Sequence, residues 1–190
     1  MPPLKEQTIA PGMSAAAITA ALRGRGRRLL IDPSLDIAAL EAILATVTSV
    51  EGAGPLLQLL ATHPSANEAL LERITDLAEQ KSEWGALNAV ATAPGTPEQI
   101  LRRLAGSPNR FVAQHAALAL VAGEMDHADP QRFREILAEH ASDSEDDAAV
   151  RSILALHPRA PEAVLEILAE DAEDTVAQAA GRRLGRSGPR

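Results

Sequence analysis

Prolines with matching neighbourhoods recur along this chain at intervals close to 30 residues. Successive members are 31, 30, 36 and 28 residues apart, and the five are Pro33, Pro64, Pro94, Pro130 and Pro158. Proline lacks a backbone N–H and disfavours helical geometry in the residue before it, so each position predicts a break between helices. Self-similarity at this period is typical of a repeat architecture, and it constrains the fold more strongly than the composition does.

Three of these prolines lie within segments of nearly the same sequence. The segments are ATHPSANEALLERI (61–74), ATAPGTPEQILRRL (91–104) and ALHPRAPEAVLEIL (155–168). In each segment a glutamate follows the proline by four residues, and aliphatic residues follow it by six, seven and ten. The helix dipole favours a glutamate in the first turn, and the aliphatic spacing marks one helical face. We therefore expect a short helix after each proline, with Thr96 as the N-cap and Pro97 as the first helical residue of the middle segment.

A second helix is predicted before the next proline of each unit. Aliphatic residues recur with helical spacing over 56–60, 86–90 and 150–154, and polar turns separate these stretches from the first helices. Two short amphipathic helices cannot bury their apolar faces alone, whereas stacked neighbouring pairs can. The predicted fold is therefore all-α, a right-handed α-solenoid of about five helix-pair repeats.

The two ends of the chain differ from its body in charge. The whole chain has 26 acidic and 18 basic residues, yet residues 1–32 carry five basic and two acidic groups, and the last ten residues carry four arginines and no acid. We expect a flexible segment over 1–28 that includes a capping helix over 14–23, a repeat domain over 29–184, and a basic tail over 185–190. No apolar run approaches the ~20 residues that span a bilayer, and a cytoplasmic location is the expectation.

Two longer strings carry a family resemblance. APGTPEQILRRLAGSPNRFVAQHAALA (93–119) and HPRAPEAVLEILAEDAEDTVAQAAGRR (157–183) resemble bacterial variant leucine-rich repeats, which are close relatives of HEAT repeats. In decreasing strength, the resemblance covers 91–119 and 155–184, then 61–74, then 30–60 and 121–154. It implies a curved helical scaffold that binds other macromolecules, and it implies no reaction. The repeat at Pro130 departs from the pattern, because Arg134 stands where the others have glutamate. The iron–sulfur centre of some family members is excluded, because the chain has no cysteine.

The sequence contains no recognisable constellation for catalysis or for a metal. It has no glycine-rich phosphate loop and no nucleophile elbow, so no enzyme activity, cofactor or metal is expected. His63 and His157 are repeat equivalents just before a proline, which predicts locally hydrogen-bonded turn residues. The acidic run from Asp143 to Asp147 lacks the glycine of a calcium loop. We expect it to be an inter-helix turn whose last acids cap a helix that begins near Asp147.

The expected function is that of a non-catalytic scaffold that binds a protein or peptide partner along a groove lined by the second helices. Trp84, the only tryptophan, opens one of these helices. It is interpreted either as an exposed anchor or as a filler of the gaps that alanines leave in a thin core. From the helical register, the partner-binding candidates are Trp84, Asn88, Arg110, Gln114, Asp147, Arg151 and Gln178.

Two other functions remain open, and for the expected protein partner the acidic run from Asp143 to Asp147 is a candidate attraction for a basic surface. A nucleic-acid-binding or DNA-processing protein would use the basic ends together with Arg102, Arg103 and Arg110, and its binding would weaken steeply with salt. An acidic body disfavours phosphates, which counts against this alternative. A structural subunit would instead oligomerise through the apolar ends of the solenoid.

Overall fold

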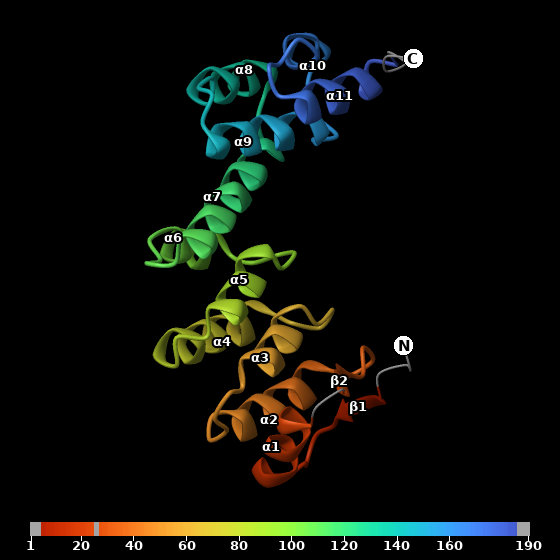
Figure 1. The fold of residues 1–190 in the computed structure, drawn as a ribbon, viewed down its shortest axis with the longest axis vertical. Helices are drawn as coiled ribbons and strands as arrows, with labels where there is room; N and C mark the ends of the chain where they lie inside the picture. Colours follow the sequence, from red (N-terminus) through yellow and green to blue (C-terminus); the bar gives the residue numbers. More distant parts are fainter. Residues whose placement is uncertain (1–4, 25–26, 186–190) are drawn as a thin grey trace. The chain divides into compact units, whose positions relative to one another are not determined.

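Short helices joined by tight turns make up most of the structure, a computed structural model that describes residues 5–24 and 27–185 (Figure 1). The described part is all-α apart from two short strands. The chain divides into two compact units, Met1–Ala116 (unit 1) and Ala117–Arg190 (unit 2), and the boundary falls inside the predicted repeat domain over 29–184. Residues 186–190 of the predicted basic tail, and residues 1–4 and 25–26 of the predicted flexible segment, lie outside the described residues.

Unit 1 begins with a strand, a helix and a second strand. The strands β1 (Lys5–Ile9) and β2 (Arg27–Ile31) are parallel, with Glu6 beside Arg28 and Ile9 beside Ile31. The helix α1 (Ala15–Arg23) connects them, with Ser14 as its N-cap, and it matches the helix predicted over 14–23. The sequence does not predict the strands, because a five-residue apolar run is compatible with either a strand or a helix.

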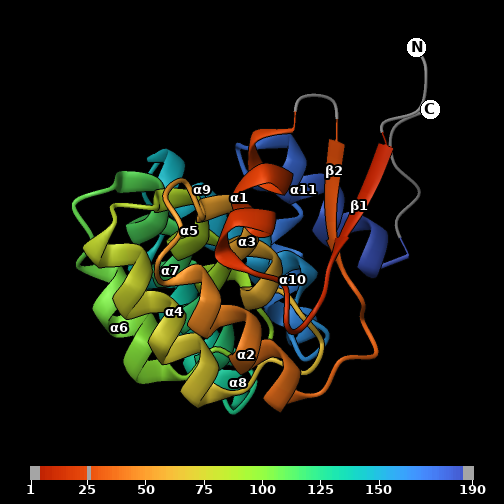
Figure 2. The same ribbon diagram turned by 90° about the horizontal axis from the view of Figure 1, so that it is seen from below.

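Helices form the rest of both units, and Figure 2 shows them from a second direction. Unit 1 continues with α2 (Ile37–Val47), α3 (Gly54–Ala61), α4 (Glu68–Gln80), α5 (Trp84–Thr92) and α6 (Glu98–Ala105). The helix α7 (Arg110–Met125) crosses the boundary, and unit 2 contains α8 (Pro130–Glu139), α9 (Glu145–Leu156), α10 (Glu162–Leu168) and α11 (Asp174–Arg183). The three glutamates predicted in first turns are confirmed, since Glu68, Glu98 and Glu162 are the first residues of α4, α6 and α10.

The predicted cap of α6 is wrong, because Thr96 is not its N-cap. Pro97 is the N-cap of α6, and the hydroxyl of Thr96 donates instead to the carbonyl oxygens of Val90 (2.7 Å) and Ala93 (3.0 Å) at the end of α5. The hydroxyl thus satisfies the end of the preceding helix, which has no intrahelical donors for its last carbonyls. The helix expected near Asp147 is α9, which begins at Glu145 with Ser144 as its N-cap, and the acids from Glu145 to Asp147 lie in its first turn.

The interval of 36 residues before Pro130 is longer than the others because it contains the long helix α7. The helices α3 and α5 have 8 and 9 residues, whereas α7 has 16. No proline interrupts the run AALALVA over 116–122, and its alanines and leucines are strong helix formers. The helix therefore continues through the position where the spacing of the prolines predicts a turn.

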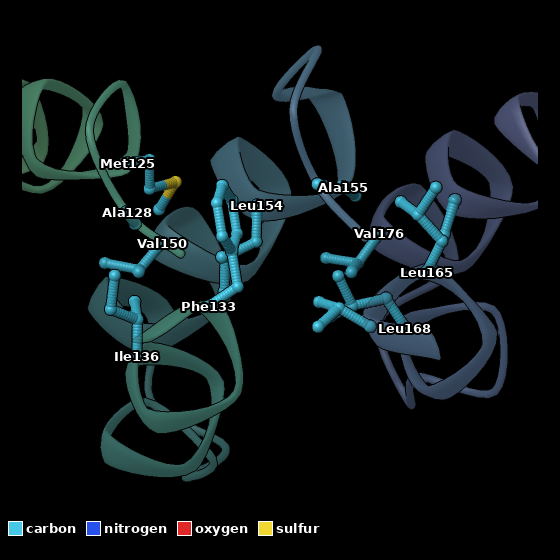
Figure 3. Packing of buried hydrophobic residues seen from close by; sticks show 13 residues of the cluster. Met125, Ala128, Phe133, Ile136, Val150, Leu154, Ala155, Leu165, Leu168 and Val176 are labelled. Atoms are coloured by element: carbon cyan, nitrogen blue, oxygen red, sulfur yellow. The ribbon is translucent and has the colours of Figure 1, made fainter. Parts of the chain in front are cut away.

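Each unit has an apolar core of aliphatic side chains. In unit 1, α2, α3 and α4 bury Leu40, Leu44, Leu56, Leu60 and Ile74 almost completely. In unit 2, Phe133 of α8 lies beside Leu154 of α9, and α10 and α11 contribute Leu168 and Val176 (Figure 3). Full burial of one such side chain stabilises a fold by ~1.5–3 kcal/mol, so these cores account for the packing of the short helices.

Histidines hold equivalent turns in the two units. In unit 1, Nε2 of His63 donates to the carbonyl oxygen of Asp32 (2.9 Å), and its Nδ1 accepts from the backbone N–H of Ser65 (3.1 Å). In unit 2, Nε2 of His157 contacts Oδ1 of Asp126 (3.2 Å), and its Nδ1 accepts from the N–H of Arg159 (3.3 Å). The predicted local hydrogen bond of both histidines is confirmed, and each also binds a residue 31 positions earlier.

Cationic side chains bind turn carbonyls at the same separation. Nζ of Lys81 donates to the carbonyl oxygens of Thr48 and Val50, both at 2.9 Å, which lie 33 and 31 residues earlier. In unit 2 the guanidinium of Arg159 donates to the carbonyls of Asp126 and Ala128, again 33 and 31 residues earlier. A cation at these positions satisfies carbonyl groups that the helix ends leave without a donor.

Candidate partner-binding surface

Two exposed aromatic side chains occupy the first turns of α5 and α7 in unit 1. Trp84 opens α5 and is 38% exposed, and Phe111 is the second residue of α7 and is 69% exposed. Their neighbours Leu87 and Val112 are buried, so the helical register turns the aromatic residues away from the core. Trp84 is therefore not the buried core filler that one interpretation of the sequence predicts.

A short hydrogen bond joins the two helices one turn beyond these aromatic residues. Nδ1 of His115 lies 2.5 Å from Oδ1 of Asn88. Asn88 follows Trp84 by four residues and His115 follows Phe111 by four, and residues at this spacing share a helical face. An amide oxygen only accepts, so Nδ1 of His115 carries the hydrogen. In the neutral imidazole the Nε2 atom of His115 is then an acceptor, and the NH₂ group of Asn88 is a donor.

The helix α3 extends this surface because glycines allow a close approach. A Cβ atom at Gly85, the second residue of α5, would clash with the side-chain amide of Gln58 on α3. A Cβ at Gly54, the first residue of α3, would clash with the carboxylate of Glu83. Gln58 is exposed, and its amide lies beside the start of α5. We call the set Gln58, Trp84, Asn88, Phe111 and His115 the aromatic–amide surface.

The predicted site residues are divided between the two units. Trp84 and Asn88 belong to the aromatic–amide surface. Arg110 is exposed beside Phe111 and Gln114 is half-buried beside His115, and both make contacts within the chain. Phe111 and His115 are missing from the predicted set, although the same helical-register argument finds them once Val112 and Ala116 are recognised as core residues. Asp147, Arg151 and Gln178 lie in unit 2, and of these Gln178 is exposed on α11.

Arg151 is buried and its donors are used inside unit 2. Its Nε and Nη2 atoms donate to the carboxylate of Asp171 at 2.7 and 3.3 Å, and Nη1 donates to the carbonyls of His140 (3.0 Å) and Ser142 (2.6 Å). The side chains of Arg151 and Asp171 are 7% and 8% exposed. This ion pair joins the turn before α9 to the turn before α11, so we leave Arg151 out of the proposed surface.

Asp147 also holds the turn before α9. Its carboxylate accepts from the hydroxyl of Ser142 and lies 2.8 Å from Nδ1 of His140. The hydrogen bond from Ser142, followed by the one from His140, lowers the pKa of Asp147 from its ordinary value of 3.8 to about 2. A carboxylate whose pKa is lower in the folded than in the unfolded chain stabilises the fold above its unfolded pKa.

We expect an acid-sensitive contribution of Asp147 to stability. Asp147→Asn should lower the free energy of unfolding at pH values above 3.8, and the difference from the wild type should shrink as the pH falls towards about 2, where Asp147 itself becomes protonated. Urea denaturation followed by circular dichroism at a series of pH values measures this difference. Asp143→Asn, which removes an exposed carboxylate from the same turn, is the matched control. A difference for Asp147→Asn that is constant across this range would contradict the assignment.

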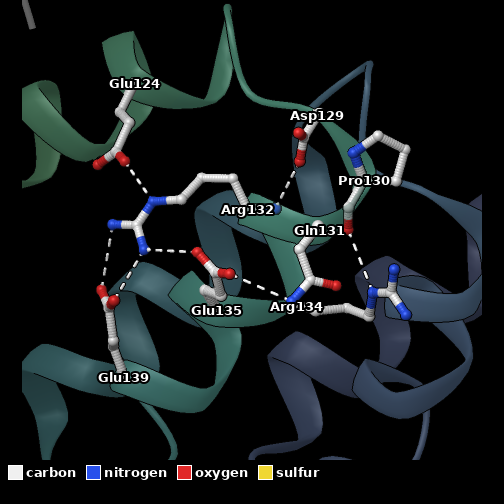
Figure 4. A network of polar contacts seen from close by, with 8 residues as sticks. All are labelled: Glu124, Asp129, Pro130, Gln131, Arg132, Arg134, Glu135 and Glu139. Carbon is white, nitrogen blue, oxygen red and sulfur yellow. Dashed lines mark hydrogen bonds and ion pairs between the residues drawn. The ribbon is translucent and has the colours of Figure 1, made fainter.

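Many surface arginines are neutralised by neighbouring acids. Figure 4 shows the guanidinium of Arg132 between Glu124, Glu135 and Glu139 on α7 and α8, with the Glu124 contact at 2.5 Å. Two of the arginines that are candidates for binding nucleic acid also form ion pairs with acidic side chains. Arg102 lies 2.5 Å from Glu98, and Arg103 pairs with Asp76 and Glu79. These acids would oppose a phosphate at the same positions.

Within residues 5–24 and 27–185, no three His, Cys, Asp or Glu side chains gather closely enough to hold a metal ion. None of the helices in these ranges is both long and apolar enough to cross a bilayer. Comparison with known proteins finds no family model, no curated protein and no solved structure that matches the chain.

Proposed function

We propose that the chain is a non-catalytic repeat scaffold that binds an extended segment of a protein partner through the aromatic–amide surface. The observation that carries the proposal is the exposure of Trp84 and Phe111 on two helices that Asn88 and His115 join. Large aromatic side chains supply most of the binding energy in many protein interfaces. The donor of Asn88 and the acceptor of His115 match the two polar groups of a peptide bond.

The scaffold is proposed to be a right-handed α-solenoid of about five helix pairs, of the variant leucine-rich repeat or HEAT-like kind. Its support is the recurrence of side-chain hydrogen bonds across 30, 31 and 33 residues, as in Ser65 to Leu35, His63 to Asp32 and Lys81 to Thr48. Separations of 31 and 33 residues recur in unit 2. A contact that repeats at a fixed separation is expected when each repeat packs only on its neighbours.

The partner proposed for the aromatic–amide surface is defined by the hydrogen bonds and apolar contacts that this surface can make, rather than by the net charge of unit 1. Unit 1 has ten basic and eleven acidic residues, which gives a net charge of −1, whereas unit 2 has eight and fifteen, which gives −7. The acidity that favours a basic partner therefore belongs mainly to unit 2. A peptide with an apolar side chain for Trp84 and Phe111 is the partner that this surface fits.

Peptides selected from a random phage-displayed library test this function. Trp84 is the only tryptophan, so its emission reports binding at the surface directly. We expect selected peptides to shift this emission, and we expect Phe111→Ala to weaken their binding by about tenfold or more in calorimetry. Ile167→Ala on α10, at a site that is 58% exposed, is the matched control and should leave binding unchanged.

The proposal fails if the selected peptides bind without changing the Trp84 emission and bind the Phe111→Ala variant as tightly as the wild type. A single-stranded DNA oligonucleotide is the counter-probe. Emission changes caused by DNA at low salt, and lost at moderate salt, would favour the nucleic-acid alternative.

A further inference from the structure

Nε2 is the atom of His115 that a partner can reach. Nδ1 of His115 donates to Oδ1 of Asn88 at 2.5 Å, whereas Nε2 makes no hydrogen bond to the residues that the structure describes. No buried side-chain nitrogen or oxygen of these residues lacks a hydrogen-bond partner, so Nε2 is not buried. In the neutral imidazole this atom therefore offers its lone pair at the surface.

The same lone pair also binds a proton. Nδ1 already carries the hydrogen that it donates to Asn88, so a proton that His115 gains goes to Nε2. The charged ring keeps its hydrogen bond to Asn88, but both of its nitrogens are then donors and it has no acceptor. A partner N–H and a solvent proton thus compete for one atom.

We propose that Nε2 of His115 accepts from a backbone N–H of the partner and that protonation of Nε2 releases the partner, an inference that rests on the proposed function. The NH₂ group of Asn88 supplies a donor on the same surface, and one residue of an extended chain presents its N–H and its C=O on the same side. The N–H groups inside a helix are already bonded, and proline has none. The contacted residue of the partner is therefore extended and is not a proline.

The charged residues of the elements around His115 are engaged in other contacts. They are Glu83 before α5, Glu98, Arg102 and Arg103 on α6, and Arg110 on the part of α7 in unit 1. The three residues of α6 form ion pairs, the carboxylate of Glu83 lies against Gly54, and Arg110 makes contacts within the chain. Histidine is the side chain whose charge ordinarily changes between pH 5 and 8, and His115 is the only histidine of α5, α6 and α7.

Binding measured against pH tests the competition between the partner and the proton. The probes are library peptides selected at pH 8 that shift the Trp84 emission. They are capped at both ends and contain no aspartate, glutamate or histidine, so the peptide itself does not titrate between pH 5 and 8. We expect the affinity of the wild type to fall about tenfold or more from pH 8 to pH 5, because the protonated ring leaves the N–H of the peptide without an acceptor.

His115→Asn removes Nε2 and keeps a donor for Asn88. The amide nitrogen of asparagine is attached to Cγ, as Nδ1 of histidine is, so it can donate to the same oxygen. This variant should bind more weakly than the wild type at pH 8, and its affinity should not change between pH 8 and pH 5. His127→Asn, at an exposed position in unit 2, is the matched control and should keep the wild-type pH profile. Circular dichroism confirms that each variant retains its helices at both pH values.

Methylation of single backbone nitrogens of the peptide locates the N–H. At pH 8, one methylated position should weaken binding to the wild type by about tenfold and binding to His115→Asn by no more than about twofold. A steric clash of the methyl group would weaken binding to both proteins equally, so the comparison isolates the hydrogen bond to Nε2.

Equal affinity of the wild type at pH 5 and pH 8 would overturn the proposal, as would the absence of any methylated position that separates the wild type from His115→Asn. An affinity that rises as the pH falls would also overturn it, since Nε2 would then donate to a carbonyl of the partner. In these cases the peptides still shift the Trp84 emission, and the proposed function stands. If no peptide shifts that emission, the proposed function fails and the role of His115 fails with it.

Discussion

Replacing Arg151 by methionine should lower the free energy of unfolding of unit 2 by about 3–5 kcal/mol, because removing one member of a buried ion pair leaves the other charge unpaired. Asp171 would keep its carboxylate in a site where the side chain is 8% exposed. The carbonyls of His140 and Ser142 would lose a donor at the same time. The turns before α9 and α11 would thus lose the contact that holds them together.

Urea denaturation followed by circular dichroism measures this loss. The double variant Arg151→Met with Asp171→Leu is the control, and it should recover most of the stability because it leaves no buried charge. Trp84 lies in unit 1, so its fluorescence reports the unfolding of that unit separately. A loss below about 1 kcal/mol for Arg151→Met would show that the pair behaves like a solvent-exposed one.

The second large effect is expected at Phe133. Phe133→Ala should destabilise unit 2 by about 3–5 kcal/mol, because it removes a large buried side chain and leaves a cavity. Phe133 is 1% exposed, and its ring lies 5.6 Å from that of His157 in a tilted arrangement. Leu154 lies beside Phe133 in the same cluster and would border this cavity (Figure 3).

Phe111→Ala makes the same change at the only other phenylalanine. Phe111 is 69% exposed, so this variant should change the free energy of unfolding by no more than about 0.5 kcal/mol. The two midpoints of urea denaturation, measured side by side, test the assignment of one phenylalanine to the core and the other to the binding surface. Equal losses in the two variants would refute it.

Local rules explain which parts of the fold are predictable from the sequence. The starts of α4, α6 and α10 are predictable because a proline break and a first-turn glutamate act within a few residues of each other. Thr96 is mispredicted because its hydroxyl bonds to Val90 and Ala93 of the preceding helix rather than to its own. The strands β1 and β2 are missed because they stabilise each other across 22 residues, and neither has a local pattern of its own.

The same distinction applies to the candidate site. Trp84 and Asn88 follow from the register of one helix, since both face away from the buried Leu87. The helical register predicts an exposed position for Arg151 as well. Its acceptor Asp171 lies 20 residues away in the sequence, however, and only the tertiary structure brings the two together. A basic residue between core positions, such as Arg151, is therefore a candidate for partner binding only when no acidic side chain of the folded chain already binds it.

The turn contacts of His63, Lys81 and Arg159 bear on how a chain of this kind can grow during evolution. Each donor follows its acceptors by about one sequence period, 31 to 33 residues. In the proposed repeat scaffold, duplication or loss of one whole period would keep such donors opposite equivalent acceptors. A gain or loss of half a period would leave turn carbonyls without donors, so the hydrogen bonding itself favours changes in length by complete modules.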